Sequence, residues 1–102
     1  MVNMIKLMKQ AAAMKENLGK VQSELADKTI EFSSGGGMVT VTAKGDGTIS
    51  AIRIDPKLVD PSDVDLLQDT VRAAVNGAIQ TAKDMAAKEM SKLTAGLGIP
   101  GL

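Results

Sequence analysis

The chain has 102 residues, a mass of 10.6 kDa and equal numbers of basic and acidic residues. This length allows one domain and argues against two. The absence of Cys and His excludes disulfides, thiolate nucleophiles, histidine bases and the usual zinc ligand sets. Phe32 is the one aromatic residue, so we expect a core of aliphatic and methionine side chains.

The composition also bears on cellular location. A small secreted domain usually carries disulfides, so the absence of Cys favours a reducing interior. No segment has the pattern of an export signal or approaches the ~18 consecutive apolar residues of a membrane span. We therefore expect a cytoplasmic protein with no membrane partner.

Charge is distributed unevenly along this neutral chain. Residues 1–20 carry four lysines and one glutamate, a balance of 4 − 1 = +3. Residues 53–72 carry three basic and five acidic residues, a balance of 3 − 5 = −2. The pattern predicts a molecule with a basic region and an acidic region.

The first predicted element is a long helix from Asn3 to Asp27. The segment contains no Pro, and its apolar residues recur at spacings of 3 and 4. This is the pattern of a coiled-coil-like seam, on a helix roughly 37 Å long, which exceeds what a small domain needs. We expect the seam to meet another helix, from the same chain or from a second copy. The candidate dimer-seam residues are Leu7, Ala11, Met14, Leu18, Val21 and Leu25.

Three short strands are predicted next, because apolar and polar residues alternate in three segments. The strands are expected at Thr29–Ser33, Met38–Lys44 and Thr48–Asp55. The glycines of Ser34–Gly37 and Gly45–Gly47 predict short connections, and therefore an antiparallel meander. The alternation slips between Ile49 and Ile52, which predicts a β-bulge.

A second long helix is predicted from about Pro61 to Lys92. Asp60 has the position of an N-cap, and Pro61 that of the first helical residue. The apolar side of this helix is rich in alanine, which allows close approach of another helix. The Gly- and Pro-containing tail, residues 94–102, is predicted to be flexible. The chain is thus expected to be one α+β domain, residues 1–93, followed by that tail.

Two motifs have both a functional and a structural interpretation. The glycine run Ser34–Gly37 lacks the following helix of a phosphate-binding loop, so a strand connection is the better interpretation. The aspartates between Asp60 and Asp69 fit no calcium-loop spacing, and the helix dipole favours acids in a first helical turn. We therefore expect no metal site, no cofactor and no small-molecule substrate.

The methionines and lysines of the two helices each leave two interpretations open. The methionines could line an adaptable partner surface, or could belong to the core or the dimer seam. They are Met4, Met8, Met14, Met85 and Met90. The lysines could contact nucleic acid or form a solvated face. The chain has one aromatic residue for base stacking and two arginines for bidentate recognition of guanine. If it binds nucleic acid, we therefore expect lysine contacts with duplex phosphates.

A further set of motifs runs through the whole chain. They are Met8–Ala11, Ser33–Val39, Ile54–Leu58, Asp60–Pro61, Leu67–Asp69, Ala73–Asn76 and Met90–Gly101. In this order they resemble the YbaB/EbfC nucleoid-associated proteins of bacteria. The resemblance implies a helix, three strands and a long helix. It also implies an intertwined, tweezer-shaped homodimer whose protruding helices bind DNA in the nucleoid without enzymatic activity.

The resemblance carries over no catalytic residue and assigns DNA contact broadly to the helices. The candidate DNA-binding residues are therefore the helical lysines Lys6, Lys9, Lys15, Lys83, Lys88 and Lys92. We expect a homodimer that binds duplex DNA and organises the nucleoid or regulates genes. The alternative is a dimeric adaptor for a DNA-replication or repair protein, with incidental DNA contact. The missing His, Cys and Tyr disfavour a small enzyme.

Overall fold

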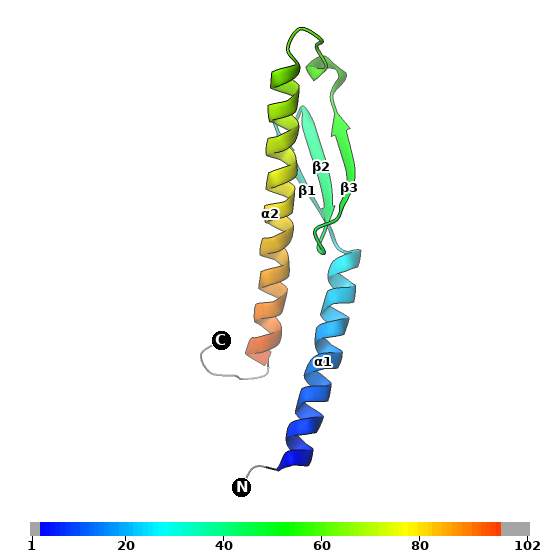
Figure 1. Ribbon diagram of the computed structural model, residues 1–102, viewed down its shortest axis with the longest axis vertical. Helices are drawn as coiled ribbons and strands as arrows, with labels where there is room; N and C mark the ends of the chain where they lie inside the picture. The colour runs from blue at the N-terminus through cyan, green and yellow to red at the C-terminus, as the bar shows by residue number, and fades with distance from the viewer. Residues whose placement is uncertain (1–2, 97–102) are drawn as a thin grey trace.

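The computed structural model describes residues 3–96 and arranges them as two helices and a three-stranded sheet (Figure 1). The elements in chain order are α1 (Met4–Asp27), β1 (Thr29–Ser34), β2 (Val39–Lys44), β3 (Ile49–Ile54), the 3-10 helix η1 (Pro56–Leu58) and α2 (Val64–Gly96). The predicted α+β fold is confirmed, with helix, meander and long helix in the predicted order.

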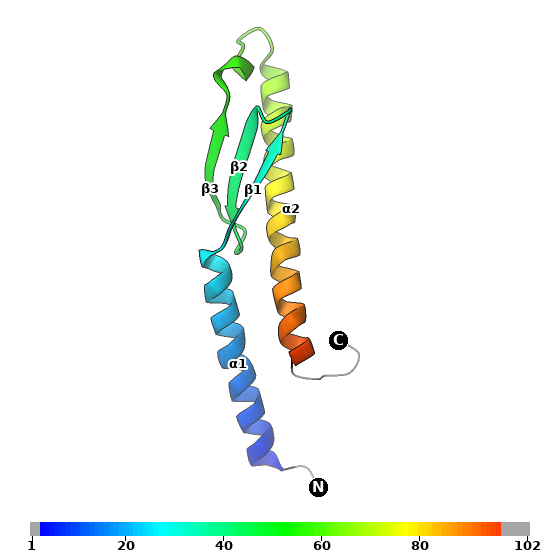
Figure 2. The same ribbon diagram turned by 180° about the vertical axis from the view of Figure 1, so that it is seen from behind.

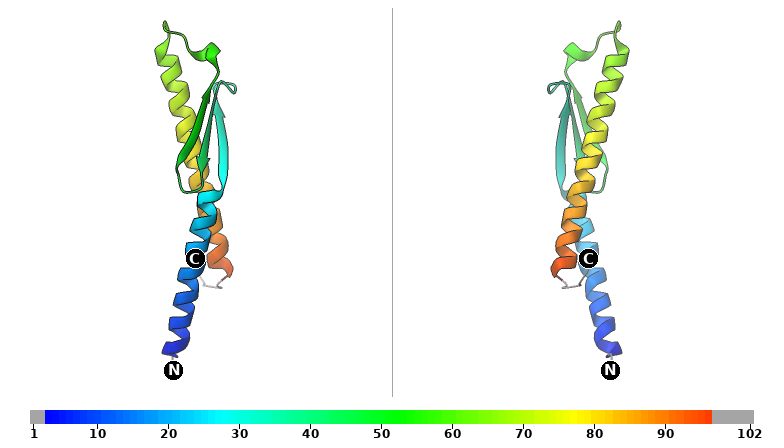
Figure 3. Two further views of the ribbon diagram at one scale, coloured as in Figure 1. Left: turned by 90° about the vertical axis from the view of Figure 1, so that its right-hand side faces the viewer. Right: turned by 90° about the vertical axis from the view of Figure 1, so that its left-hand side faces the viewer.

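The molecule is elongated. Its principal axes extend 73, 24 and 16 Å, and its radius of gyration is 19.8 Å, whereas a compact chain of this length has about 13 Å. The cause is α1, which leaves the foot of the sheet and continues beyond the end of α2 (Figures 1 and 2). The side views show the sheet and α2 as two layers, with the N-terminal part of α1 extending past both (Figure 3).

Asn3 determines where α1 begins. Its side-chain oxygen accepts hydrogen bonds from the backbone N–H groups of Ile5 at 3.0 Å and Lys6 at 3.3 Å. These bonds satisfy two of the donors that have no partner at the start of a helix. The helix ends at Asp27, as predicted, and begins at Met4, one residue later than predicted, because Asn3 is its cap.

The three strands form an antiparallel sheet with β2 in the centre. Glycines 35–37, between β1 and β2, all have positive φ between 62 and 90°, a conformation that glycine adopts without strain. The segment therefore joins two strands, as predicted, and no helix follows it. In the β2–β3 turn, Gly47 has a φ of 90° and donates a hydrogen bond to the Lys44 carbonyl at 2.9 Å.

β3 contains the predicted bulge. Thr42 pairs with Ala51, whereas the next residue of β2 pairs with Ile49, so Ser50 is an extra residue in the register. The extra residue places Ile49 on the same face of the sheet as Ile52. This is the physical reason for the slip in the apolar alternation.

The core lies between β2 and α2, where one face of the strand and one stripe of the helix are fully buried. The residues are Val39, Val41, Ala43, Ala74, Ala78 and Ala82. Alanine side chains are small, so they let the helix backbone come close to the sheet. α2 packs mainly over β1 and β2, and this arrangement leaves β3 at the side of the layer.

α2 begins later than predicted. The Asp60 carboxylate accepts hydrogen bonds from the N–H and the hydroxyl of Ser62, which closes a local turn before the helix. Asp63 is the cap, because its carboxylate accepts a hydrogen bond from the Leu66 N–H at 3.3 Å. The prediction that Asp60 caps the helix and Pro61 opens it is therefore wrong.

α2 also ends later than predicted. It continues to Gly96 rather than stopping near Lys92. Helical backbone thus includes residues 94–96, which were expected to open the flexible tail. The rest of the predicted tail, residues 97–102, lies outside the described residues.

Gly77, in the middle of α2, permits contact with Phe32, because a Cβ atom at this position would overlap with the phenyl ring. We predict that Gly77→Ala lowers the free energy of unfolding by about 1 kcal/mol or more, since the ring must leave its site. This loss exceeds the gain in helix propensity. Chemical denaturation measures it, with Gly19→Ala as the control, because no atom lies within 4 Å of a Cβ there. A Gly77→Ala protein stabilised as much as the control would contradict the prediction.

Candidate nucleic-acid interface

α1 is anchored to the rest of the molecule at its C-terminal end. Leu25 is 6 % exposed. Gly45 lies against it, since a Cβ atom at Gly45 would collide with the Leu25 carbonyl oxygen. The Gly45 N–H also donates a hydrogen bond to the Lys28 carbonyl at 2.9 Å. These contacts determine the direction in which α1 leaves the sheet.

An ion pair joins the same end of α1 to α2. The Glu89 carboxylate lies 3.4 Å from the Lys28 ammonium and 3.5 Å from that of Lys92. The hydrogen bond and charge of Lys28, together with the charge of Lys92, hold the pKa of Glu89 below its ordinary value of 4.5. Glu89 thereby neutralises part of the positive charge of α2.

The structure divides the predicted dimer seam into two parts. Its buried or half-buried residues are Leu18, Val21 and Leu25. Its exposed residues are Leu7, Ala11 and Met14. The first part is covered within the chain near the anchored end of α1. Contact of either part with a second chain stays a prediction.

Every residue of α1 from 4 to 17 is exposed, and we call this segment the α1 prong. Lys6, Lys9 and Lys15 lie on it, and its first acidic residue is Glu16. Within residues 3–96, none of these three lysines takes part in an ion pair. Lys6 and Lys9 are about 60° apart around the helix axis and share a face, whereas Lys15 is about 120° from Lys9. The prong is therefore a basic surface without carboxylates from residue 4 to residue 15.

The three candidate lysines of α2 do not form one cluster. Lys88 and Lys92 are about 40° apart around the helix axis, but Lys83 is about 140° from Lys88. Asp84 and Glu89 stand among them, and Glu89 pairs with Lys92. This part of α2 is therefore a weaker phosphate-binding surface than the α1 prong.

The acidic segment, residues 53–72, lies at the opposite end of the molecule from the free end of α1 (Figure 1). Its carboxylates have local roles. Asp55 accepts a hydrogen bond from the Lys57 N–H, Asp63 caps α2, and Asp69 pairs with Arg72 at 3.2 Å. The predicted separation of basic and acidic regions is thus a separation along the long axis of the molecule.

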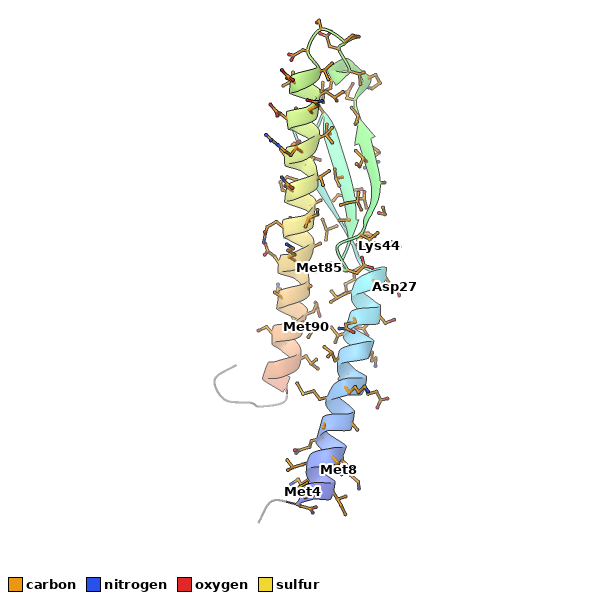
Figure 4. All side chains as sticks on the ribbon, in the orientation of Figure 1. Met4, Met8, Asp27, Lys44, Met85 and Met90 are labelled. Carbon is orange, nitrogen blue, oxygen red and sulfur yellow. The ribbon has the colours of Figure 1, made fainter. Side chains whose placement is uncertain are left out.

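The methionines do not share one surface (Figure 4). Met4 and Met8 are exposed near the free end of α1, whereas Met85 and Met90 are half-buried on α2, beside the anchored end of α1. An apolar groove of about 340 Å³ at that end is lined by Gln22, Leu25, Gly45, Asp46, Ala86 and Met90. Met85 and Met90 therefore belong to the region where α1 meets α2, whereas Met4, Met8 and Met14 belong to the prong.

The described part of the chain holds neither a metal-ligand cluster nor a membrane-spanning helix. Among residues 3–96, no three His, Cys, Asp or Glu side chains come together. No helix in that range is both long and apolar enough to cross a bilayer. The exposed lysines of the prong are the most distinctive chemical feature that remains.

Comparison with known sequences places the chain in a family. Residues 1–97 match the YbaB/EbfC DNA-binding family. The chain belongs to the YbaB/EbfC family. The resemblance seen in the sequence motifs is therefore confirmed, and it extends over α1, the sheet and α2. The family is named for DNA binding and its curated relatives for the nucleoid, not for an enzymatic activity.

Individual relatives agree with this assignment. A nucleoid-associated protein of Acetivibrio thermocellus is 52% identical over 98% of this chain and 89% of its own length. Another, from Clostridium novyi, is 50% identical over 99% of this chain and 89% of its own. The crystal structure of an uncharacterized protein from Helicobacter pylori superposes with a TM-score of 0.82. It is 21% identical, with 92% of this chain and 99% of that chain covered, so it shows a common fold.

Sequence inspection did not single out Ile52 and Ile54 as interface candidates. Both lie on the core face of the sheet, yet they are 45 and 38 % exposed. The sequence did contain a sign that the sheet is incompletely covered. One helix, α2, must cover three strands, because the apolar residues of α1 form a separate seam. The alternation of β3 shows which face is apolar, but not that α2 packs to one side of it.

The pKa of Glu89 is lowered in the folded state, so its ion pairs stabilise the protein above the ordinary value of 4.5 and lose this effect as the pH falls through the lower folded value. We predict that Glu89→Gln slightly lowers the melting temperature at pH 7. The difference from the unmodified protein should disappear in acid. Glu16→Gln is the control, since Glu16 forms no ion pair within the described residues. An equal loss at every pH would show that the charge has no role.

Proposed function

We propose that this protein binds duplex DNA as a homodimer, through lysine–phosphate contacts of the α1 prong, and catalyses no reaction. The observation that carries this proposal is the exposed prong, with Lys6, Lys9 and Lys15 and no carboxylate before Glu16. Lysine contacts with phosphates supply affinity that is largely independent of sequence. The names of the curated relatives support a place in the bacterial nucleoid, in the cytoplasm, with a role in nucleoid organisation or gene regulation.

The homodimer is supported by the half-covered face of the sheet. In the register, Ile52 lies opposite Val41 and Ile54 lies opposite Val39, and both of these partners are fully buried. The two isoleucines thus continue the core face to the side that α2 leaves open. A second copy related by a two-fold axis would cover this side and would have its own β3 covered in return. Burial of exposed isoleucine is the driving force for such an association.

A two-fold axis would present two α1 prongs. Each prong carries the same lysines, so the dimer would offer two basic surfaces able to straddle or bridge a duplex. The acidic segment would stay remote from DNA held at the prong tips, which limits like-charge repulsion. Lys83, Lys88 and Lys92 stand closer to the anchored end and would add secondary contacts.

Ile52→Asp should convert the dimer into a monomer, because it places a charge in the contact that we propose. The mass in solution should fall from twice the chain mass to 10.6 kDa. Ala51→Asp is the matched control, since Ala51 is exposed and its side chain belongs to the opposite face of the same strand. Sedimentation equilibrium at micromolar concentration measures both variants. A monomeric unmodified protein, or an Ile52→Asp variant that remains dimeric, would refute this interface.

Lys6→Glu combined with Lys9→Glu should weaken binding to all duplex sequences about equally. The slope of log affinity against log salt should fall by about one unit for each phosphate that the protein no longer neutralises. Fluorescence anisotropy with two unrelated duplexes at several salt concentrations measures both quantities. The matched control combines Lys57→Glu with Arg72→Glu, which changes net charge by the same amount at the acidic end.

The two outcomes of this titration separate the candidate functions. If the prong contacts DNA, the Lys6→Glu/Lys9→Glu protein binds more weakly and with a smaller salt slope. The Lys57→Glu/Arg72→Glu control then keeps more of the affinity and more of the salt slope. Unchanged affinity and slope in a folded, dimeric Lys6→Glu/Lys9→Glu protein would remove the prong as the contact surface. That result would favour the adaptor function, in which DNA contact is incidental.

A further inference from the structure

The free end of the α1 prong carries three large apolar side chains that nothing in the described chain covers. Met4, Ile5 and Met8 are 68, 66 and 68 % exposed. Figure 4 shows Met4 and Met8 at this end, remote from the sheet and from α2. We call these three residues the apolar tip. Large apolar side chains exposed together are typical of an interaction surface.

The apolar tip is not a continuation of the dimer seam. The seam is centred near the direction of Leu7 and Leu25, which coincide around the helix axis. Met8 points about 100° away from that direction and Ile5 about 160°, while Met4 lies at the edge of the seam. A helix that covered the seam would therefore leave Met8 and Ile5 exposed.

Basic groups lie beside the apolar tip, next to Ile5 around the helix axis. The first turn of α1 contains no acidic residue, although helix dipoles favour acids there. It contains Lys6 instead, and Lys9 follows one turn later. The positive end of the helix dipole and these ammonium groups together favour an anionic partner.

We propose that the apolar tip inserts side chains between base pairs in the minor groove of duplex DNA, while the flanking lysines contact the phosphates. This inference rests on the proposed function and specifies how the prong meets DNA. An α-helix, with a diameter of about 10–12 Å, does not fit a minor groove about 6 Å wide. Side chains at a helix end do fit, and methionine and isoleucine are among the residues that act as wedges between base steps.

The dimensions of the tip favour DNA over an anionic lipid surface. A helix that lies in a membrane interface needs an apolar face that continues over many turns. Here the next residues on the same face are Ala12, Lys15 and Glu16, so the apolar surface ends after about two turns. A short apolar wedge with lysines beside it suits insertion between bases next to phosphates better than it suits a lipid surface.

The test uses the full chain and a duplex with 2-aminopurine at a central TA step, which unstacks easily. Saturating protein should raise the fluorescence roughly twofold or more, because a wedge unstacks the probe, and end-to-end energy transfer should report a kink of about 20° or more. The variant Met4→Ala/Ile5→Ala/Met8→Ala should abolish both signals. It should keep the salt slope, since Lys6, Lys9 and Lys15 are unchanged. Val59→Ala, an exposed apolar residue at the other end, is the control.

Each alternative outcome has a distinct meaning. An undiminished signal in the triple variant, or binding by the unmodified protein without any signal, would overturn the wedge and leave the lysine contacts standing. Absence of DNA binding by the unmodified protein would overturn the proposed function and the wedge with it. Loss of binding to phosphatidylglycerol vesicles in the triple variant, with no 2-aminopurine signal, would identify lipid as the partner and overturn the wedge.

Discussion

The close contact between α2 and β2 determines the rest of the architecture. Ala74, Ala78 and Ala82 let the helix lie near the strand, but small side chains also limit how much of the sheet the helix can cover. α2 therefore packs over β1 and β2 and leaves the isoleucines of β3 partly exposed. A tight intramolecular contact and an open apolar face thus have the same origin. The second copy that we propose would complete a core that one chain builds only in part.

Elongation gives the charge pattern its physical meaning. In a compact neutral molecule, lysines of the first helix would stand near the aspartates that precede the second, and their fields would largely cancel. Here the acidic segment and the α1 prong occupy opposite ends of a molecule 73 Å long, many times the Debye length of about 8 Å at physiological salt. Net charge is therefore a poor guide to what this protein binds. In the function that we propose, the local charge of the prong decides it.

Much of the fold could be predicted from the sequence, because alternation and glycine positions determine the strands, and even the bulge at Ser50 was visible as a slip. The start of α2 could not be predicted, because Asp60 and Asp63 both suit an N-cap and only the turn geometry distinguishes them. The candidate site was predicted in part. The basic prong follows from local composition, but the pairing of Glu89 with Lys28 joins residues 61 positions apart and has no local signal.

Attachment at one end makes α1 a lever. From Leu25 to Met4 the helix extends roughly 32 Å, so a tilt of about 10° at the anchored end displaces its tip by about 5 Å. Resistance to this tilt comes only from the C-terminal part of α1, where Leu18, Val21 and Leu25 are covered and Lys28 pairs with Glu89. In the dimer that we propose, the separation between two such levers would be adjustable at low energetic cost. The protein that we propose to bind DNA would then accommodate duplexes of different local width and curvature without rearranging its core.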